Sequence, residues 1–149
     1  MLASELAVGA GVRTRPTEST SGDRMTERVQ IFHEFLDAIE AGDSDRALSL
    51  CTDDITFWHN TTLMEEPADS LVATITWLHG NFTKVYYERG IVRDGNDSVT
   101  AEVVLCATAP DGDTVRTPTC VIADYRDGAI FRERVYLSTS HSLRNKVPR

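Results

Sequence analysis

A histidine closes a short apolar run, at a point where its ring could enter a pocket. Residues 53–57 read DDITF, and Trp58, His59 and Asn60 follow directly. An imidazole with an unperturbed pKa of about 6.5 can accept a proton and return it near neutral pH. The sequence therefore offers His59 as a general base or acid, with a structural histidine satisfied in the core as the alternative.

The residues around His59 have the chemistry of a small-molecule site. The Asn60 amide could hold a substrate carbonyl or hydroxyl, although an asparagine after a strand could equally form a turn. Trp58, Phe57 and Trp77 could supply apolar walls, although large aromatic residues also serve as plain core. We expect these side chains to lie around one pocket.

Other polar side chains could face the same pocket. Glu65 and Glu66 are adjacent on a predicted loop, where one carboxylate could act as an acid opposite His59, or both could be solvated. Tyr86 and Tyr87 alternate across a predicted strand, so one phenol points inward. The sequence leaves open which tyrosine this is.

Metal and phosphate chemistry are not indicated. The four histidines, which are His33, His59, His79 and His141, are scattered singly, and none pairs with cysteine or acidic residues at ligand spacing. The chain has no phosphate-binding glycine loop, no nucleophile elbow and no CxxC pair. We expect no metal and no cofactor.

Length and charge limit the possible partners. The chain has 149 residues, which fits one domain, and a net charge of -8, which would repel nucleic acid and anionic lipid. The basic residues Arg144, Lys146 and Arg149 are interpreted as a solvated tail. Neither a signal peptide nor a membrane span is evident. Three cysteines, which leave one unpaired in any scheme, favour a reducing compartment and hence the cytoplasm.

The hydrophobic pattern predicts the elements that position His59. Residues 1–24 lack periodicity and predict a disordered leader, so that Met25 is an alternative start to Met1. Apolar residues at helical spacing predict a first helix from Val29, with Gly42 as its cap, and a short second helix after it. The same spacing predicts a third helix over residues 71–78, with Gly80 as its stop. A strand over residues 55–59 separates the second helix from the third.

The second half of the chain predicts an antiparallel meander. Four β runs cover residues 82–93, 98–109, 114–126 and 129–138, separated by Asp-Gly turns. The order α-α-β-α-β-β-β-β is typical of an α+β domain in which a curved sheet wraps three helices. We assign this domain to residues 25–140, with a flexible tail at 141–149.

This order, with the corner at residues 41–43, the TDDI entry to the first strand and the RDGAI turn at residues 126–130, resembles the nuclear transport factor 2-like superfamily. Its ketosteroid-isomerase-like and polyketide-cyclase-like (SnoaL-like) branches are the most similar. The resemblance, which covers residues 25–140, implies a cone-shaped barrel with a deep apolar pocket, and a homodimer.

The resemblance also carries site residues onto this sequence. The general-base aspartate of the isomerases falls on His59, their oxyanion-binding tyrosine falls on Phe35, and their protonated acid falls near Val121. The isomerase machinery is therefore incomplete. The register of the family points Glu102 inward, where it could orient His59 as a dyad. The alternative is that Glu102 faces solvent, since a slip of one residue reverses a strand.

A second branch, similar to limonene epoxide hydrolase, uses an Asp-Arg-Asp constellation. The matching positions here are Val104, Glu102 and Val135, so this mechanism is excluded on that register. 

Two functions follow from these residues. The first is a cofactor-independent enzyme that isomerises, cyclises or dehydrates an apolar carbonyl compound, with His59 as catalytic base. Asn60 and Glu102 would position substrate and base, and Phe35, Phe57 and Trp77 would form the walls. The alternative is a non-catalytic module on the same fold that binds a hydrophobic ligand or serves in dimerisation.

Overall fold

The computed structural model describes residues 25–138 and 143–147. The predicted leader at residues 1–24 and positions 139–142, 148 and 149 lie outside the described residues. The elements are α1 (Glu27–Ala41), α2 (Ser44–Ser49), β1 (Cys51–His59), β2 (Glu65–Pro67), α3 (Ala68–Asn81), β3 (Lys84–Gly95), β4 (Ser98–Thr108), β5 (Thr114–Arg126), β6 (Ala129–Leu137) and the 3-10 helix η1 (Leu143–Lys146). The predicted order of three helices and five long strands is confirmed, with β2 and η1 as additions.

The helix ends follow from local chemistry. The Thr26 hydroxyl accepts a hydrogen bond from the Val29 amide at the start of α1, and Gly42 ends this helix with a φ of 73°, which favours glycine. A side chain at position 42 would also press on the His79 ring, 3.3 Å away. The predicted stop at Gly80 is wrong, because α3 continues to Asn81 and its last bond runs from the Phe82 amide to the Leu78 carbonyl.

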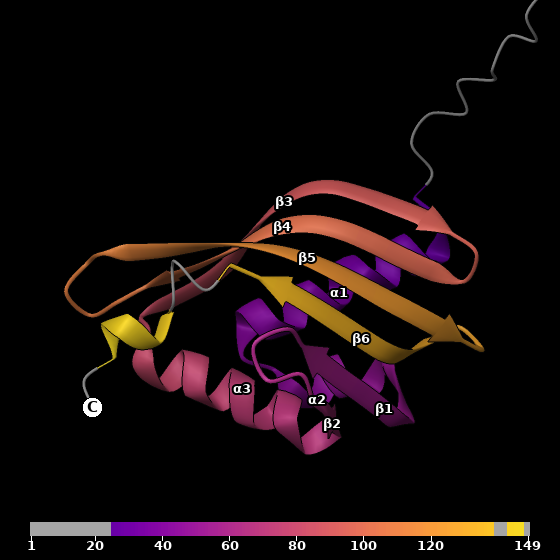
Figure 1. Ribbon diagram of the computed structural model, residues 1–149, viewed down its shortest axis with the longest axis horizontal. Helices are drawn as coiled ribbons and strands as arrows, with labels where there is room; N and C mark the ends of the chain where they lie inside the picture. Colours follow the sequence, from indigo (N-terminus) through magenta and orange to yellow (C-terminus); the bar gives the residue numbers. More distant parts are fainter. Residues whose placement is uncertain (1–24, 139–142, 148–149) are drawn as a thin grey trace, which may run out of the picture.

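The six strands form one curled sheet in the order β2-β1-β6-β5-β4-β3 (Figure 1). β1 pairs with β6 in parallel and with β2 antiparallel, and the meander from β3 to β6 is antiparallel throughout. Register shifts interrupt three of these ladders, and such irregularities bend the strands that contain them. The expected barrel is therefore a curled sheet that does not close, since β2 and β3 remain its edges.

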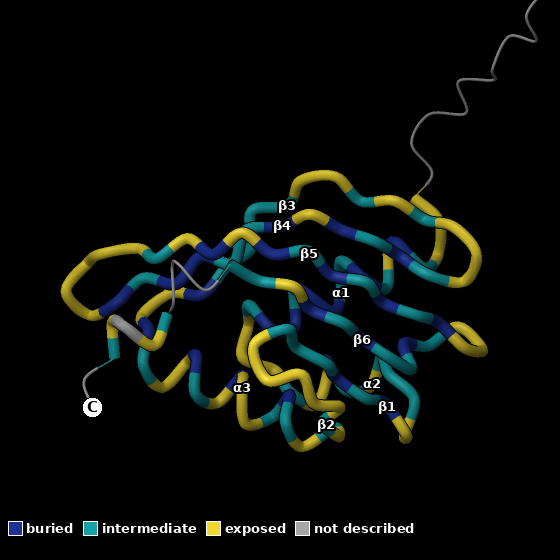
Figure 2. Tube along the Cα trace, viewed as in Figure 1, coloured by how far each residue is buried: buried dark blue, intermediate teal, exposed yellow. Residues whose placement is uncertain are grey.

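The core lies between the inner face of this sheet and the helices α1 and α3. Figure 2 shows buried positions alternating mostly with half-buried ones along β4 and β5, and exposed positions gathered at the hairpin ends. Phe32, Phe35 and Leu36 of α1 pack against Ile55 and Val99 in the larger of two apolar clusters. A smaller cluster joins the end of α3 to β3 and β4. Within the described part of the chain, no helix is long and apolar enough to cross a membrane.

Candidate functional site

An apolar cavity of about 790 Å³ lies between the helices α1 and α3 and the inner face of the sheet. Its apolar walls come from every layer of the fold. They include Leu36 and Ile39 of α1, Phe57 of β1, Leu71, Ile75, Trp77 and Leu78 of α3, Leu105 of β4, Val121 of β5, and Val135 and Leu137 of β6. A volume of this size fits a small organic molecule.

His59 lies at the end of β1 and faces this cavity. Burial lowers the pKa of its ring, and the carboxylate of Glu66, which lines the same cavity, partly opposes this effect. No other described residue forms a hydrogen bond with the ring. His59 is therefore a neutral imidazole at pH 7 that can accept a proton from a molecule in the cavity.

Glu133 is the second ionisable group of the cavity and lies deeper than His59. The β6 ladders place it opposite Phe57 on one side and Ala123 on the other, and only 7% of it is exposed. Its Oε2 atom has no hydrogen-bond partner among the described residues. Burial raises the pKa of this carboxyl to about 8, so Glu133 is a neutral acid at pH 7 and can donate its proton.

Tyr87 is the tyrosine that points inward. It lines the cavity from β3, and its amide donates to the Glu40 carboxylate over 2.7 Å. Burial raises the pKa of its phenol, and the nearby Glu133 raises it further. Tyr86 faces the other side of the strand, where the Lys84 ammonium lies 4.6 Å from its ring centroid. Tyr87 thus offers the cavity a hydroxyl donor.

Three of the predicted site residues line the cavity, namely His59, Phe57 and Trp77. Glu66 is one of the two adjacent acids that the sequence placed on a loop, and it also lines the cavity, from the short strand β2. Its neighbour Glu65 instead forms an ion pair with Arg132. The structure therefore separates the two acids, with one at the cavity and one on the surface.

Four other predicted site residues lie elsewhere. The inward direction that the family register implied for Glu102 is wrong, and the structure has the alternative, a Glu102 that faces solvent. Ala101 and Val103 take the inner face of β4, and no His59–Glu102 dyad forms. Phe35 is fully buried in the core and does not line the cavity. Trp58 packs on Tyr136, with ring centroids 5.2 Å apart, on the other face of the sheet.

Asn60 acts as a structural tie between strands. Its amide nitrogen donates to the Leu137 carbonyl over 3.1 Å, and its amide oxygen accepts from the Leu137 amide over 3.0 Å. Both ends of the side chain are thus used to hold the end of β1 against β6. The expectation that Asn60 binds substrate is replaced by this role in fixing His59 beside β6.

Glu133 is the site residue that the sequence analysis missed. Its signal was present, since Glu133, Val135 and Leu137 alternate along β6, and an acid that shares a face with two apolar residues is expected to be buried. The neighbouring Arg132 and Arg134 hid this signal, because a run of charges usually lies on a solvated face.

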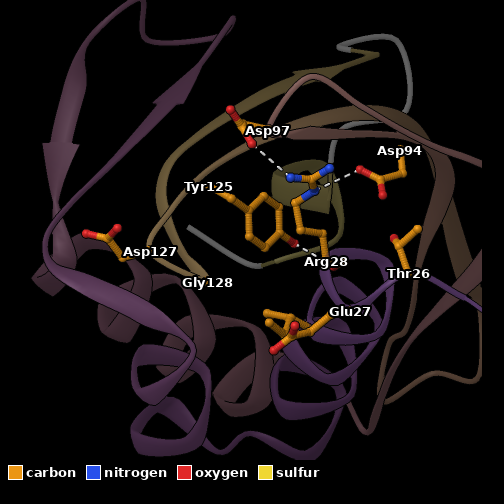
Figure 3. Close-up of a pocket in the computed structure, with 9 residues that line it drawn as sticks. Thr26, Glu27, Arg28, Asp94, Asp97, Tyr125, Asp127 and Gly128 are labelled. Carbon is orange, nitrogen blue, oxygen red and sulfur yellow. Dashed lines mark hydrogen bonds and ion pairs between the residues drawn. The ribbon is translucent and has the colours of Figure 1, made fainter.

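A second hollow, of about 350 Å³, lies at the start of α1 and is organised by ion pairs (Figure 3). The Arg28 guanidinium donates to Asp94 and Asp97, each over 2.9 Å, and the Tyr125 hydroxyl donates to the Arg28 carbonyl over 2.9 Å. These bonds join α1 to the β3–β4 hairpin and to β5. The bonds of Arg28 and Tyr125 are internal to the fold, so they stabilise the packing of α1 on the sheet.

Among the described residues, no group of three histidine, cysteine or acidic side chains is placed to hold a metal ion. The three cysteines are free thiols, and burial raises the pKa of the Cys51 thiol to about 12.

Comparisons with known proteins agree with this architecture. Residues 32–133 match the family model described as a SnoaL-like domain. A hypothetical protein with a ketosteroid isomerase-like fold from Catenulispora acidiphila is 16% identical, with a TM-score of 0.68 over 80% of this chain and 94% of that chain. An NTF2-like protein of unknown function from Burkholderia pseudomallei is 13% identical, with a TM-score of 0.70 over 83% of this chain and 100% of that chain.

A third similar structure is IdmH from Streptomyces antibioticus, proposed to be a polyketide cyclase. It is 13% identical, with a TM-score of 0.71 over 80% of this chain and 97% of that chain. No curated protein matches the sequence. At these identities the solved structures establish the shared fold alone, and they confirm the expected nuclear transport factor 2-like architecture.

The buried Glu133 carboxyl should make the protein less stable as the pH rises. In the unfolded chain this group ionises near 4.5, whereas in the folded protein it keeps its proton up to about pH 8. Between these values the native state binds more protons than the unfolded state, so the free energy of unfolding falls. Glu133→Gln should remove this fall. Between pH 4.5 and 8 the free energy of unfolding of the variant should therefore rise relative to that of the wild type by on the order of 4 kcal/mol.

Urea denaturation at several pH values between 4.5 and 8.5 measures this difference. Glu102→Gln is the matched control, because it makes the same chemical change at an exposed position on the neighbouring sheet surface. Parallel stability curves for the wild type and Glu133→Gln would show that the carboxyl is not buried in its neutral form.

Proposed function

Because the chain belongs to the SnoaL-like domain family, we propose that it is a cofactor-independent enzyme that moves a proton on an apolar carbonyl compound. The observation that carries this proposal is the pairing of His59 and Glu133 on one apolar cavity. One is a base that is neutral at pH 7 and the other is an acid that is neutral at pH 7. Groups with opposite proton needs in one cavity are the components of acid–base catalysis.

The proposed reaction begins at a carbon next to the substrate carbonyl. His59 removes a proton from this carbon and becomes an imidazolium, and the electron pair of the broken C–H bond moves into the enolate. Glu133 and Tyr87 donate hydrogen bonds to the oxygen on which the negative charge develops. Such donors are most effective in an apolar cavity, where little water competes with them.

The enolate can then follow one of three courses. Return of the proton from His59 to a different carbon gives isomerisation. Attack of the enolate carbon on a second carbonyl of the same molecule forms a ring, with a proton delivered to the new alkoxide. Loss of a hydroxyl from the neighbouring carbon, protonated as it leaves, gives dehydration. In all three courses the His59 imidazolium returns its proton and Glu133 and Tyr87 hold the oxygen, which is why the substrate rather than the site distinguishes them.

Non-catalytic binding of a hydrophobic ligand is the second candidate. The absence of the isomerase tyrosine at Phe35 and of the isomerase acid at Val121 favours it. Tyr87 and Glu133 offer hydrogen-bond donors from other strands, which weakens this argument for a binding module.

On the ground of the odd number of cysteines, the proposed location is the cytoplasm.

We also propose that the protein is a homodimer joined through the outer face of its sheet. The Trp58 and Tyr136 rings pack against each other on that face, and 41% of Tyr136 is exposed to solvent in the single chain. Exposed aromatic pairs of this kind are typical anchors of protein interfaces.

Replacing His59 should abolish proton removal from a ketone. The probe is 2-decalone deuterated beside its carbonyl, because it is apolar and rigid, and loss of deuterium to water requires only the first step of the proposed reaction, enolate formation. We expect the protein to accelerate this loss and His59→Gln to slow the catalysed rate by about 100-fold or more. Mass spectrometry of the recovered ketone measures the rate.

His33→Gln is the control for this substitution, because His33 lies on α1 beside Arg89, outside the cavity. A wild-type protein without any catalysed loss of deuterium would favour the binding module, and unchanged catalysis in His59→Gln would remove His59 from the mechanism.

The same reaction should have a bell-shaped dependence on pH. The rate should rise as His59 loses its proton, with a midpoint below 6.5, since burial lowers its pKa. It should fall again near pH 8, where Glu133 ionises and no longer donates a proton. In Glu133→Gln the maximal rate should drop at least about tenfold and the alkaline fall should disappear. An alkaline fall that persists in this variant would assign it to another group.

Replacing Tyr136 with glutamate should convert the proposed dimer into a monomer, because a charge would be buried at the interface. Light scattering after gel filtration measures the mass. Ile91→Glu is the control, since Ile91 is an exposed apolar residue on the edge strand β3. A wild-type protein with the mass of one chain at micromolar concentration would refute the dimer.

A further inference from the structure

Glu66 and His59 are neighbours on the inner face of the β1–β2 ladder. This ladder pairs Phe57 with Glu66 and Trp58 with Glu65. Residues that lie opposite one another in a ladder point to the same face, so Glu66 shares the inner face with Phe57. His59, two residues further along β1, points to that face as well. Both side chains accordingly line the cavity.

The spacing of the two residues allows their side chains to meet. Because Phe57 lies opposite Glu66, His59 and Glu66 are diagonal neighbours on adjacent strands. Such neighbours are about 7–8 Å apart, a separation that long side chains can bridge. The glutamate has three rotatable bonds and is only half-buried, so its carboxylate can move towards the ring.

The Glu66 carboxylate is unpaired within the part of the chain that the structure describes. No hydrogen bond or ion pair joins it to a described residue. Its neighbour Glu65, on the outer face, pairs with Arg132 instead. The group on which the Glu66 charge does act is His59: burial lowers the pKa of the ring, and the carboxylate raises it. Glu66 is therefore a negative charge beside a neutral base.

The main chain around His59 is fixed, whereas its ring is not. The His59 carbonyl accepts hydrogen bonds from the amides of Thr62 and Leu63 over 3.2 and 2.9 Å. The Asn60 amide donates to the Val135 carbonyl over 3.0 Å. The ring itself has no hydrogen bond with a described residue. Its direction therefore depends on the groups that it meets in the cavity.

The other ionisable side chains of the cavity are Tyr87, Glu133 and Arg144. Burial raises the pKa of both the Tyr87 phenol and the Glu133 carboxyl, so both groups are neutral at pH 7. Arg144 lies over the Trp77 ring, on the segment η1. This segment packs on the end of α3, so the solvated tail expected from the sequence is packed over these residues.

The length of α3 separates Arg144 from Glu66. β2 leads directly into α3, and Trp77 lies near the end of this helix (Figure 1). With a rise of about 1.5 Å per residue, the start of α3 and Trp77 are roughly 14 Å apart. Among the described lining residues, Glu66 is thus the one negative charge at pH 7, and it lies at the His59 end of the cavity.

We propose that Glu66 is a positioning residue for His59, and that its carboxylate pairs with the imidazolium as this forms. In the step concerned, the C–H bond of the substrate breaks, its electron pair forms the enolate, and the proton binds the ring nitrogen that faces the substrate. The other ring N–H donates to the carboxylate, which keeps its charge. A charged donor binds a carboxylate more strongly than a neutral one, so the pairing strengthens as the proton moves. This inference rests on the proposed function, and it adds a counter-charge to the base.

The titration of the His59 ring tests the pairing without any substrate. NMR spectroscopy of the histidine ring protons between about pH 4 and 8 measures its midpoint, and His59→Gln assigns the signal. Glu66→Gln should lower the midpoint by about half a pH unit or more, because no carboxylate then stabilises the imidazolium. The ring signals of His33 and His79, which lie outside the cavity, report whether each variant is folded.

Glu65→Gln is the matched control. It makes the same chemical change on the same strand, but on the outer face beside Arg132. The midpoint of His59 should stay nearly constant in this variant. Glu66→Asp, which keeps the charge on a shorter side chain, should retain part of the effect of the wild-type glutamate.

Glu66→Gln should also change the decalone reaction in two linked ways. The acid limb of the pH profile should move to lower pH together with the NMR midpoint. The maximal kcat should fall about fivefold to tenfold, because the ring becomes a weaker base and its cation is less stable. KM should change by less than about twofold, since Glu66 acts on the ring and not on the ketone. An effect on folding alone would lower the rate without moving the acid limb.

An unchanged His59 midpoint in Glu66→Gln would overturn the proposal. An equal change in Glu65→Gln would also do so, because the effect would then be one of net charge. A raised KM with unchanged kcat would assign Glu66 to ligand binding instead.

The two tests separate this inference from the proposed function. A midpoint that depends on Glu66, without any catalysed loss of deuterium, would refute the enzyme alone. His59-dependent loss of deuterium that Glu66→Gln does not slow would refute this inference alone.

Discussion

β1 and β6 pair in parallel, and this ladder connects the helical half of the chain to the meander. It places Phe57 opposite Glu133 and His59 opposite Val135, although 76 residues separate the members of each pair. Asn60 fastens the end of the ladder with two hydrogen bonds to Leu137. The base and the acid are thus set on adjacent strands by backbone geometry, and the helices need only cover them.

The buried position of Glu133 lowers the stability of the fold and keeps its carboxyl neutral. A carboxyl that stays neutral at pH 7 requires a dry, apolar surrounding. Because the same carboxyl is ionised at pH 7 in the unfolded chain, burying it in its neutral form lowers the free energy of unfolding. An apolar residue at this point would fill the cavity and stabilise the fold, as Val121 and Val135 do beside it. An acid with an unpartnered oxygen is therefore best explained by what it does for a bound molecule.

The elements were predictable from the sequence, and the directions of single side chains were less so. Periodicity and caps located the helices and the meander, because the burial of apolar faces dominates both. The alternation of Val99, Ala101 and Val103 already directs Glu102 outward, and the register taken from the resemblance hid this. β2 was missed because three residues that include Pro67 carry no β pattern of their own, and it forms only by pairing with β1.

Arg144 and Lys146 show why net charge describes the chain poorly at short range. A sum of -8 predicts that anions are repelled at a distance, but charges separated by more than about 8 Å are largely screened at physiological salt. At the cavity rim the Arg144 guanidinium lies over the Trp77 ring, and the Lys146 ammonium faces Asp111 and Asp113 of the β4–β5 turn. The lysine therefore fixes η1 to this turn through charge. Local pairing, set by contacts remote in sequence, decides which charges are compensated, and composition cannot report it.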